Sequence, residues 1–264
     1  MKTSMLSGKT ALVTGSTSGI GLGIARTLAE QGANIVFNGF GDAAQIEKLV
    51  QGVAQEFGVR TDYHNADMSK PAEIEAMMRF ADEKFGGVDV LVNNAGIQYV
   101  ANIEDFPVEK WDAIIAINLS SAFHTSRMAL PGMKRKNWGR IINIASVHGL
   151  VGSAQKSAYV AAKHGVVGLT KVTALETAHT GVTCNAICPG FVLTPLVQKQ
   201  VDDRAAKDAI SNEAAKKALL TEKQPSGEFV TPEELGALAV FFCSCAGDQV
   251  RGAAWNMDGG WTAQ

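Results

Sequence analysis

Tyr159 and Lys163 are two residues of this chain whose types and spacing could carry out chemistry together. In a helix, a spacing of four places both side chains on one face. A tyrosine with its ordinary pKa of about 10 is a poor base at neutral pH, but a nearby ammonium favours the phenolate and lowers that pKa. Ser146 ends an apolar segment just before the pair, so its hydroxyl could hold a substrate oxygen there. The three residues predict a proton-transfer site, although a Tyr–Lys pair by itself is usually a surface feature.

A glycine-rich segment at residues 14–21 (TGSTSGIG) follows an apolar run and precedes a helical pattern. Its glycines permit a tight turn and let the backbone approach a pyrophosphate, which would lie at the positive end of the helix. The spacing is GxxxGxG, and its position after the first strand favours a nucleotide site over an ordinary turn. A second candidate, residues 93–96 (NNAG), ends another apolar run, and its alternative is a common Asn/Gly turn.

These residues need a scaffold, and the chain alternates short apolar runs with helical patterns. Strands without polar alternation are buried on both faces, which is typical of a parallel sheet covered by helices. The alternation predicts an α/β fold, a doubly wound parallel sheet of the Rossmann type with about seven strands, in a single domain of residues 1–264. Strands are expected at 10–14, 34–38, 60–65, 89–93, 140–145, 183–188 and 252–257. Helices are expected at 19–31, 42–57, 70–85, 108–135 (interrupted around Asn118) and 157–178.

An insertion at about residues 193–230 interrupts this pattern with one polar helix rich in alanine and lysine. A weakly packed helix beside the ligand side of the sheet could be a mobile lid, and a plain surface helix is the alternative. Its apolar positions form only a thin stripe: Val201, Ala205, Ile210, Ala214 and Leu219.

Composition excludes several classes of function. The formal net charge is -2 and 46% of residues are hydrophobic, which argues against nucleic-acid binding and against disorder. The apolar run at 235–243 is too short to span a bilayer, and the first residues do not resemble a signal peptide. The four cysteines lack metal-binding spacing, and Cys184 and Cys188 are expected to be buried thiols in an apolar stretch. A reducing cytosol fits these thiols, so we expect a cytoplasmic protein with no metal site.

The glycine loop, the NNAG turn, Asn118, Ser146, the YxxxK pair and residues 189–190 together resemble the short-chain dehydrogenase/reductase family, in its order and spacing and over almost the whole chain. The resemblance implies hydride transfer between nicotinamide and a carbonyl or alcohol. It implies that Tyr159 is the general acid/base and that Ser146 orients the substrate oxygen. Lys163 would lower the pKa of the tyrosine and bind the nicotinamide ribose, and Asn118 would hold a proton-relay water.

The expected cofactor is NAD. Family members that use NAD usually carry an acid after the second strand, and this chain has NGFG at residues 38–41 instead. Members that use NADP usually carry Arg or Lys there or in the glycine loop, and this chain has neither, so no cation is ready to pair a 2′-phosphate. The resemblance implies these cofactor-binding residues: Gly15, Thr17, Ser18, Gly19, Ile20, Gly21, Phe40, Asp67, Met68, Asn94, Gly96, Tyr159, Lys163, Pro189, Gly190, Val192 and Thr194.

Further residues near the predicted centre offer hydrogen-bond donors for a small anion and an indole wall: Gln98, His148, Lys156, Gln200 and Trp261. Each alone could be an ordinary surface or packing residue. Together with Ser146 and Tyr159 they resemble the substrate site of family members that interconvert (R)-3-hydroxybutyrate and acetoacetate, where the matching residues hold the carboxylate. Charge-assisted donors suit such a group.

Two rival functions stay open at this point. One is an NADPH-dependent 3-oxoacyl reductase of the same family, which would need a basic residue for the 2′-phosphate. The other is a non-catalytic dinucleotide-binding protein, because fold alone does not give function. The resemblance also implies a homo-oligomer, a tetramer packed through helices at 108–134 and 157–178 and through C-terminal strands.

Overall fold

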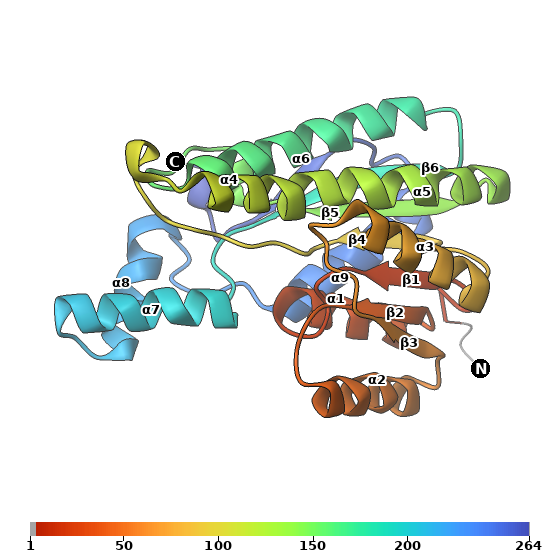
Figure 1. Cartoon of the computed structure of the whole chain (residues 1–264), viewed down its shortest axis with the longest axis horizontal. Helices are drawn as coiled ribbons and strands as arrows, with labels where there is room; N and C mark the ends of the chain where they lie inside the picture. Colours follow the sequence, from red (N-terminus) through yellow and green to blue (C-terminus); the bar gives the residue numbers. More distant parts are fainter. Residues whose placement is uncertain (1–3, 264) are drawn as a thin grey trace.

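The protein is described here by a computed structural model that covers residues 4–263 (Figure 1). Seven parallel strands form one sheet in the order β3-β2-β1-β4-β5-β6-β7. The chain builds outward from β1 to β3, then returns to place β4 on the other side of β1, so the predicted doubly wound sheet is confirmed. The strands are β1 (Thr10–Val13), β2 (Asn34–Asn38), β3 (Thr61–His64), β4 (Val90–Asn93), β5 (Gly139–Ile144), β6 (Val182–Pro189) and β7 (Ala254–Met257).

Helices cover both faces of the sheet (Figure 1). Alternate strand residues point to opposite faces, so Val13 packs beneath α1, α2 and α9 while Leu12 packs beneath α3 and α5. The helices are α1 (Gly19–Glu30), α2 (Ala43–Phe57), α3 (Pro71–Phe85), α4 (Val108–Ile115), α5 (Ser121–Lys136), α6 (Ser157–Glu176), α7 (Pro195–Asp208), α8 (Asn212–Lys223) and α9 (Pro232–Cys243).

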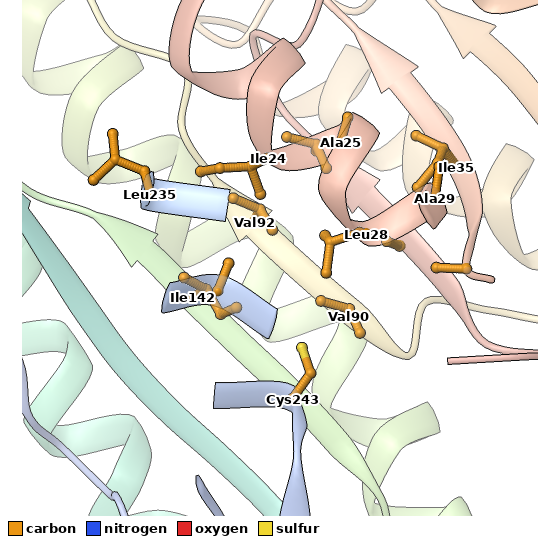
Figure 2. Packing of buried hydrophobic residues seen from close by; sticks show 14 of the residues in the cluster. Ile24, Ala25, Leu28, Ala29, Ile35, Val90, Val92, Ile142, Leu235 and Cys243 are labelled. Carbon is orange, nitrogen blue, oxygen red and sulfur yellow. The ribbon is translucent and has the colours of Figure 1, made fainter. Parts of the chain in front are cut away.

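Helix α9 is an element that the sequence patterns did not predict. Its apolar run at 235–243 is too short to cross a bilayer, and a helix buried on most sides lacks the polar stripe that marks an amphipathic helix. Figure 2 shows Leu235 and Cys243 of α9 facing the same buried cluster as Ile24 and Leu28 of α1. Thr231 caps the helix through a reciprocal capping box with Glu234.

The expected interruption near Asn118 is confirmed as a single wider turn at Ala116–Ser120 between α4 and α5. The Asn118 side chain accepts a hydrogen bond from the Ile97 N–H at 2.9 Å and donates to the Ile97 carbonyl at 3.0 Å. The wider turn therefore ties this helix pair to the loop that follows β4.

The insertion differs from the prediction, because it contains two helices instead of one. Ala209 takes a left-handed conformation with φ of 52° and ends α7, and the Ser211 side chain then caps α8. This break shifts the helical phase between α7 and α8. The expected stripe of buried apolar residues is therefore confirmed for Val201 and Ala205 in α7. It is wrong in α8, where Ala214 is exposed and its neighbour Ala215 is buried. Figure 1 shows α7 and α8 side by side, projecting from the sheet.

Two further expectations concern the burial of the cysteine thiols and the presence of a membrane-spanning helix. The thiols of Cys184, Cys188 and Cys243 are free and buried, whereas Cys245 is exposed. Among residues 4–263, no helix combines the length and apolar character that a bilayer crossing requires.

Candidate active site

A cavity of about 490 Å³ opens at the carboxyl ends of the strands, where parallel α/β sheets bind their ligands. The loops after β1 to β6 form its walls, together with α6, α7 and the C-terminal segment. It brings together most of the residues predicted for the site: Gly15, Thr17, Ser18, Gly19, Ile20, Phe40, Asp67, Met68, Asn94, Gly96, Gln98, Ser146, His148, Lys156, Tyr159, Lys163, Pro189, Gly190, Val192, Thr194, Gln200 and Trp261.

Two predicted site residues do not line the cavity. Gly21 lies in the first turn of α1, where a Cβ atom would collide with the carbonyl oxygen of Gly15 and with the Asn94 side chain, so its role is close packing of the helix on the loop. Asn118 is 3% exposed, and both ends of its amide are bound to the Ile97 backbone. It supports the cavity wall from behind and is not free to hold a ligand directly.

Several lining residues escaped the sequence analysis. Phe191 lies between two predicted residues, Gly190 and Val192, but its own side chain carries no polar group that a motif would reveal. Asn38 and Gly39 precede the predicted Phe40 in the NGFG stretch and line the cavity with it. The others are small or apolar residues whose position depends on the folded loops: Ala66, Ala95, Ile97, Ile117, Ile144, Ala145, Val147 and Val197.

The glycine loop is held by polar contacts from two neighbouring strands. Gly15 and Gly19 have positive φ angles of 61° and 55°, conformations that favour glycine. Asn94 donates from its side chain to the carbonyls of Thr14 and Gly15, both at 2.9 Å. The loop therefore leads into the N-terminus of α1 in a fixed shape that fits a pyrophosphate.

Ser146 and Tyr159 meet at the inner end of the cavity. Ser146 stands directly after β5 and accepts a hydrogen bond from the His148 N–H at 3.1 Å, while Tyr159 projects from the first turn of α6. Burial raises the pKa of Tyr159, and a hydrogen bond with Ser146 partly offsets this rise. The tyrosine is therefore protonated at neutral pH in this state of the protein.

Lys163 lies one helical turn after Tyr159 on the same face, as the spacing predicts. Its Nζ lies 5.6 Å from the centre of the Tyr159 ring and donates to the Ile144 carbonyl at 2.7 Å. Burial lowers the pKa of Lys163 to about 8. The expected lowering of the tyrosine pKa by this ammonium is not found, because burial opposes charge on both groups and the ammonium is directed at a backbone carbonyl.

The predicted anion-binding residues share one wall. His148 lies edge-on to Trp261 with ring centroids 5.4 Å apart, and edge-on to Tyr159 at 6.1 Å. The buried Nδ1 of His148 has no hydrogen-bond partner within the described chain. Burial, aided by the positive charge of Lys156, lowers the pKa of His148 to about 4. The imidazole is therefore neutral at pH 7, which corrects the expectation of a charge-assisted donor there.

Lys156 is the cation closest to this wall in the cavity lining, and burial also lowers its pKa from the ordinary value. Gln98 comes from the loop after β4, and Gln200 comes from α7 of the insertion. Two amides, one neutral imidazole and one ammonium thus surround the space beside Ser146 and Tyr159. This donor set fits a small acid better than an apolar ligand.

Comparisons with known proteins agree with this geometry. Residues 9–205 match the family model of short chain dehydrogenases. The chain is 74% identical over 260 residues to D-beta-hydroxybutyrate dehydrogenase of Cupriavidus necator, covering 98% of this chain and 100% of that protein. It is 57% identical over 256 residues to the Rhizobium meliloti enzyme of the same name, covering 97% and 99% of the two chains.

Solved structures show the same fold. A single-residue variant of actinorhodin polyketide ketoreductase with NADPH superposes with a TM-score of 0.90 at 35% identity, covering 98% of this chain and 99% of that one. The L-sorbose reductase of Gluconobacter frateurii, complexed with NADPH and L-sorbose, superposes with a TM-score of 0.94 at 30% identity, covering 99% of each.

Proposed function

Because the chain belongs to the short chain dehydrogenase family, we propose that it is an NAD-dependent dehydrogenase that interconverts (R)-3-hydroxybutyrate and acetoacetate. The observation that carries this proposal is the cavity in which Ser146 and Tyr159 face a wall of donors for a carboxylate. A proton acceptor and an anion-binding wall that line one cavity suit a short hydroxy acid.

The proposed proton transfer uses the residues at the inner end of the cavity. In oxidation, Tyr159 takes the proton from the C3 hydroxyl, and Ser146 holds the same oxygen in position. NAD supplies the hydride acceptor when it is bound, since its nicotinamide takes the C3 hydrogen with its electron pair. In reduction, Tyr159 returns the proton to the oxygen of acetoacetate.

Two further residues support this step. Lys163 is buried one turn away, and we assign it to the nicotinamide ribose and to favouring the phenolate once the ligands are in place. Asn118 fixes the loop at Ile97 and is assigned to a proton-relay water. In this assignment Asn118 acts through the backbone that it positions.

The fixed glycine loop and the N-terminus of α1 fit the pyrophosphate of the cofactor, and the cavity runs from there to Tyr159. We assign to NAD the predicted cofactor-binding residues that line the cavity. Gly21 is not among them, because its role is the packing of α1 on the glycine loop. The Asp67 carboxylate accepts hydrogen bonds from the N–H and hydroxyl of Ser69, at 2.9 Å and 2.7 Å. These contacts fix the Asp67 carboxylate, which we assign to the adenine ring.

The carboxylate of the substrate is assigned to Lys156, Gln98 and Gln200, with His148 as a neutral donor and Trp261 as the wall. The insertion at about 193–230 acts as a lid, since Gln200 of α7 reaches the cavity from it. A bound carboxylate would then draw α7 toward the sheet.

We further propose a cytoplasmic homotetramer acting in ketone body metabolism, with one domain spanning residues 1–264. Residues 1–3 and 264 of that span lie outside the described part of the chain. Apolar side chains exposed on α5 and α6 support assembly through these helices: Phe123, Val172 and Leu175.

The deciding experiment follows NADH absorbance while the purified protein receives each 3-hydroxybutyrate enantiomer with NAD or with NADP. We expect turnover of the (R) form with NAD, slow turnover of the (S) form, and little activity with NADP. A methyl ester of the (R) acid controls for the carboxylate and should be a poor substrate. Rapid reduction of a 3-oxoacyl thioester with NADPH, without oxidation of 3-hydroxybutyrate, would favour the reductase alternative instead.

A further inference from the structure

The turn at Gly39 and Phe40 lines a part of the cavity that is remote from the proton-transfer residues. It follows β2, whereas Ser146 follows β5, and β1 and β4 lie between these two strands. Three steps of about 4.8 Å between neighbouring strands separate the two positions by roughly 14 Å. If the nicotinamide lies beside Ser146 and Tyr159, the adenosine end of the cofactor therefore reaches this turn.

At positions 38 and 39, an acidic side chain would require the surroundings to rearrange. Gly39 has a φ of 149°, and a Cβ atom there would lie 2.7 Å from the Thr17 hydroxyl oxygen. The preceding Asn38 is buried and fully engaged. Its amide donates to the carbonyls of His64 and Ala66 at 3.0 Å and 2.9 Å, and accepts from the Gly15 N–H at 3.3 Å. A carboxylate at position 38 would face two carbonyl oxygens with no donor to satisfy them.

Two hydroxyl groups instead hold the backbone of the turn. Tyr63 of β3 donates to the Gly39 carbonyl at 2.6 Å, and Thr17 of the glycine loop donates to the Phe40 carbonyl at 2.9 Å. Consecutive carbonyls are thus fixed by side chains from two different elements. Burial also raises the pKa of Tyr63, so its hydroxyl remains a donor at neutral pH.

We propose that Thr17 and Tyr63 are positioning residues for the cofactor, and that the backbone turn they fix gives the selectivity for NAD in place of an acidic side chain. This proposal rests on the proposed function. Each fixed carbonyl keeps a second lone pair, which can accept a hydrogen bond from a ribose hydroxyl. A 2′-phosphate at the same place has only acceptor oxygens, and it would meet these carbonyls without a donor.

The charge near the turn also disfavours binding of a 2′-phosphate. Residues 38–42 contain one charged residue, Asp42, and it is acidic. Its carboxylate accepts from the Gln45 N–H at 2.9 Å and caps α2, so the helix end that could attract a phosphate is already paired with an anion.

The test compares Tyr63→Phe and Thr17→Val with Thr17→Ser, which keeps the hydroxyl, and with Tyr99→Phe, which alters a tyrosine outside the cavity lining. NADH and NADPH binding are measured by fluorescence titration, without any substrate. We expect Tyr63→Phe and Thr17→Val each to weaken NADH binding about 3- to 10-fold, the effect of one lost neutral hydrogen bond. NADPH binding should change less, so the preference for NADH should fall. Thr17→Ser should bind NADH more tightly than Thr17→Val because it keeps the hydroxyl, and Tyr99→Phe should match wild type.

Kinetics supply a second readout that a merely structural defect would not reproduce. In both variants the KM for NAD should rise while kcat at saturating NAD stays within about twofold of wild type, because the turn is remote from the reacting atoms. Equal weakening of NADH and NADPH, or no change in either variant, would overturn the proposal. Because the titrations use nucleotide alone, they remain decisive even if the wild-type protein does not oxidise 3-hydroxybutyrate.

Discussion

At the scale of single residues, burial governs the chemistry of this site. It raises the pKa of Tyr159, lowers that of Lys163 to about 8 and lowers that of His148 to about 4. Each shift favours the neutral form of the group, as removal from water requires. At neutral pH Tyr159 and His148 are therefore uncharged, Lys163 with its pKa of about 8 stays mostly protonated, and Lys156 supplies a positive charge for an acid.

Tyr159→Phe is expected to reduce kcat for (R)-3-hydroxybutyrate by at least about 100-fold, since general acid/base groups typically contribute about 10²–10⁴-fold. The phenyl ring preserves the packing against His148, so the dissociation constant of NADH should change by less than about threefold. Steady-state kinetics and NADH fluorescence titration measure the two effects. A variant that keeps more than a tenth of the wild-type rate would show that another group accepts the proton.

Sequence motifs could identify the residues of the proposed proton transfer because their chemistry depends on residue type and short spacing. Tyr159 and Lys163 are one helical turn apart in any α-helix, and Ser146 follows a strand that its apolar residues reveal. The protonation states of these side chains could not be predicted from the sequence in the same way. The neutral His148 and the raised pKa of Tyr159 arise from burial by segments distant in the sequence, which no local pattern encodes.

At the scale of elements, the loops after successive strands carry the site, and α7 carries a part of it that projects from the sheet (Figure 1). Strands and amphipathic helices were predictable because their apolar periodicity directly reflects which face is buried. Helix α9 and the break at Ala209 could not be predicted from the sequence. The first is buried on most sides, and the second depends on one residue in a left-handed conformation rather than on a glycine.

Gln200→Ala tests whether α7 contributes to the carboxylate site. Losing a hydrogen bond to a charged group typically costs about 1.5–3 kcal/mol, which is roughly a 10- to 150-fold loss of kcat/KM. Because a bound acid would also hold the lid closed, kcat should fall together with the apparent affinity for (R)-3-hydroxybutyrate. NADH binding should stay unchanged, and steady-state kinetics with fluorescence titration separate these effects.

Gln198→Ala is the matched control for this variant. Gln198 lies on the same helix but donates to Asp202 at 2.8 Å and does not line the cavity, so its loss should leave the kinetics near wild type. An uncharged ester of 3-hydroxybutyrate should respond little to either change. The carboxylate assignment fails if Gln200→Ala and Lys156→Ala both leave the kinetics of the acid unaltered.

At the scale of the whole molecule, α5 and α6 form an outer layer with unpaired apolar side chains. On α6, Val172 is 51% exposed and Leu175 is 76% exposed. Exposed apolar residues gathered on one face mark an interaction surface more often than single scattered ones do. Two copies packed about a two-fold axis would cover these positions in pairs.

Leu175→Lys is therefore expected to weaken the tetramer, because a two-fold axis would bring two added charges together where apolar contact is lost. Light scattering at micromolar concentration should give a tetrameric mass for wild type and a smaller mass for the variant. Ile103→Lys, at an equally exposed apolar position outside both helices, should remain tetrameric. A monomeric wild-type protein, or a tetrameric Leu175→Lys variant, would contradict assembly through α6.

The buried His148 links the site to the stability of the whole molecule. Its pKa is about 4 in the folded chain and about 6.5 when unfolded, so between these values the unfolded chain binds a proton that the folded chain does not. Unfolding is therefore favoured as pH falls from about 6.5, and the loss is complete near pH 4. The positive charges of Lys156 and Lys223 add to the effect of burial, because they disfavour the imidazolium.

His148→Gln should remove this part of the acid sensitivity, because the amide does not titrate. At about pH 5 the wild-type loss is on the order of 2 kcal/mol, from 1.36 kcal/mol per pKa unit. Denaturant unfolding of both proteins at one concentration, near pH 7.5 and near pH 5, measures the change. The stability of the variant relative to wild type should rise by that amount at the lower pH. Parallel losses in the two proteins would show that His148 is protonated in the folded chain, and that the carboxylate wall carries a second positive charge.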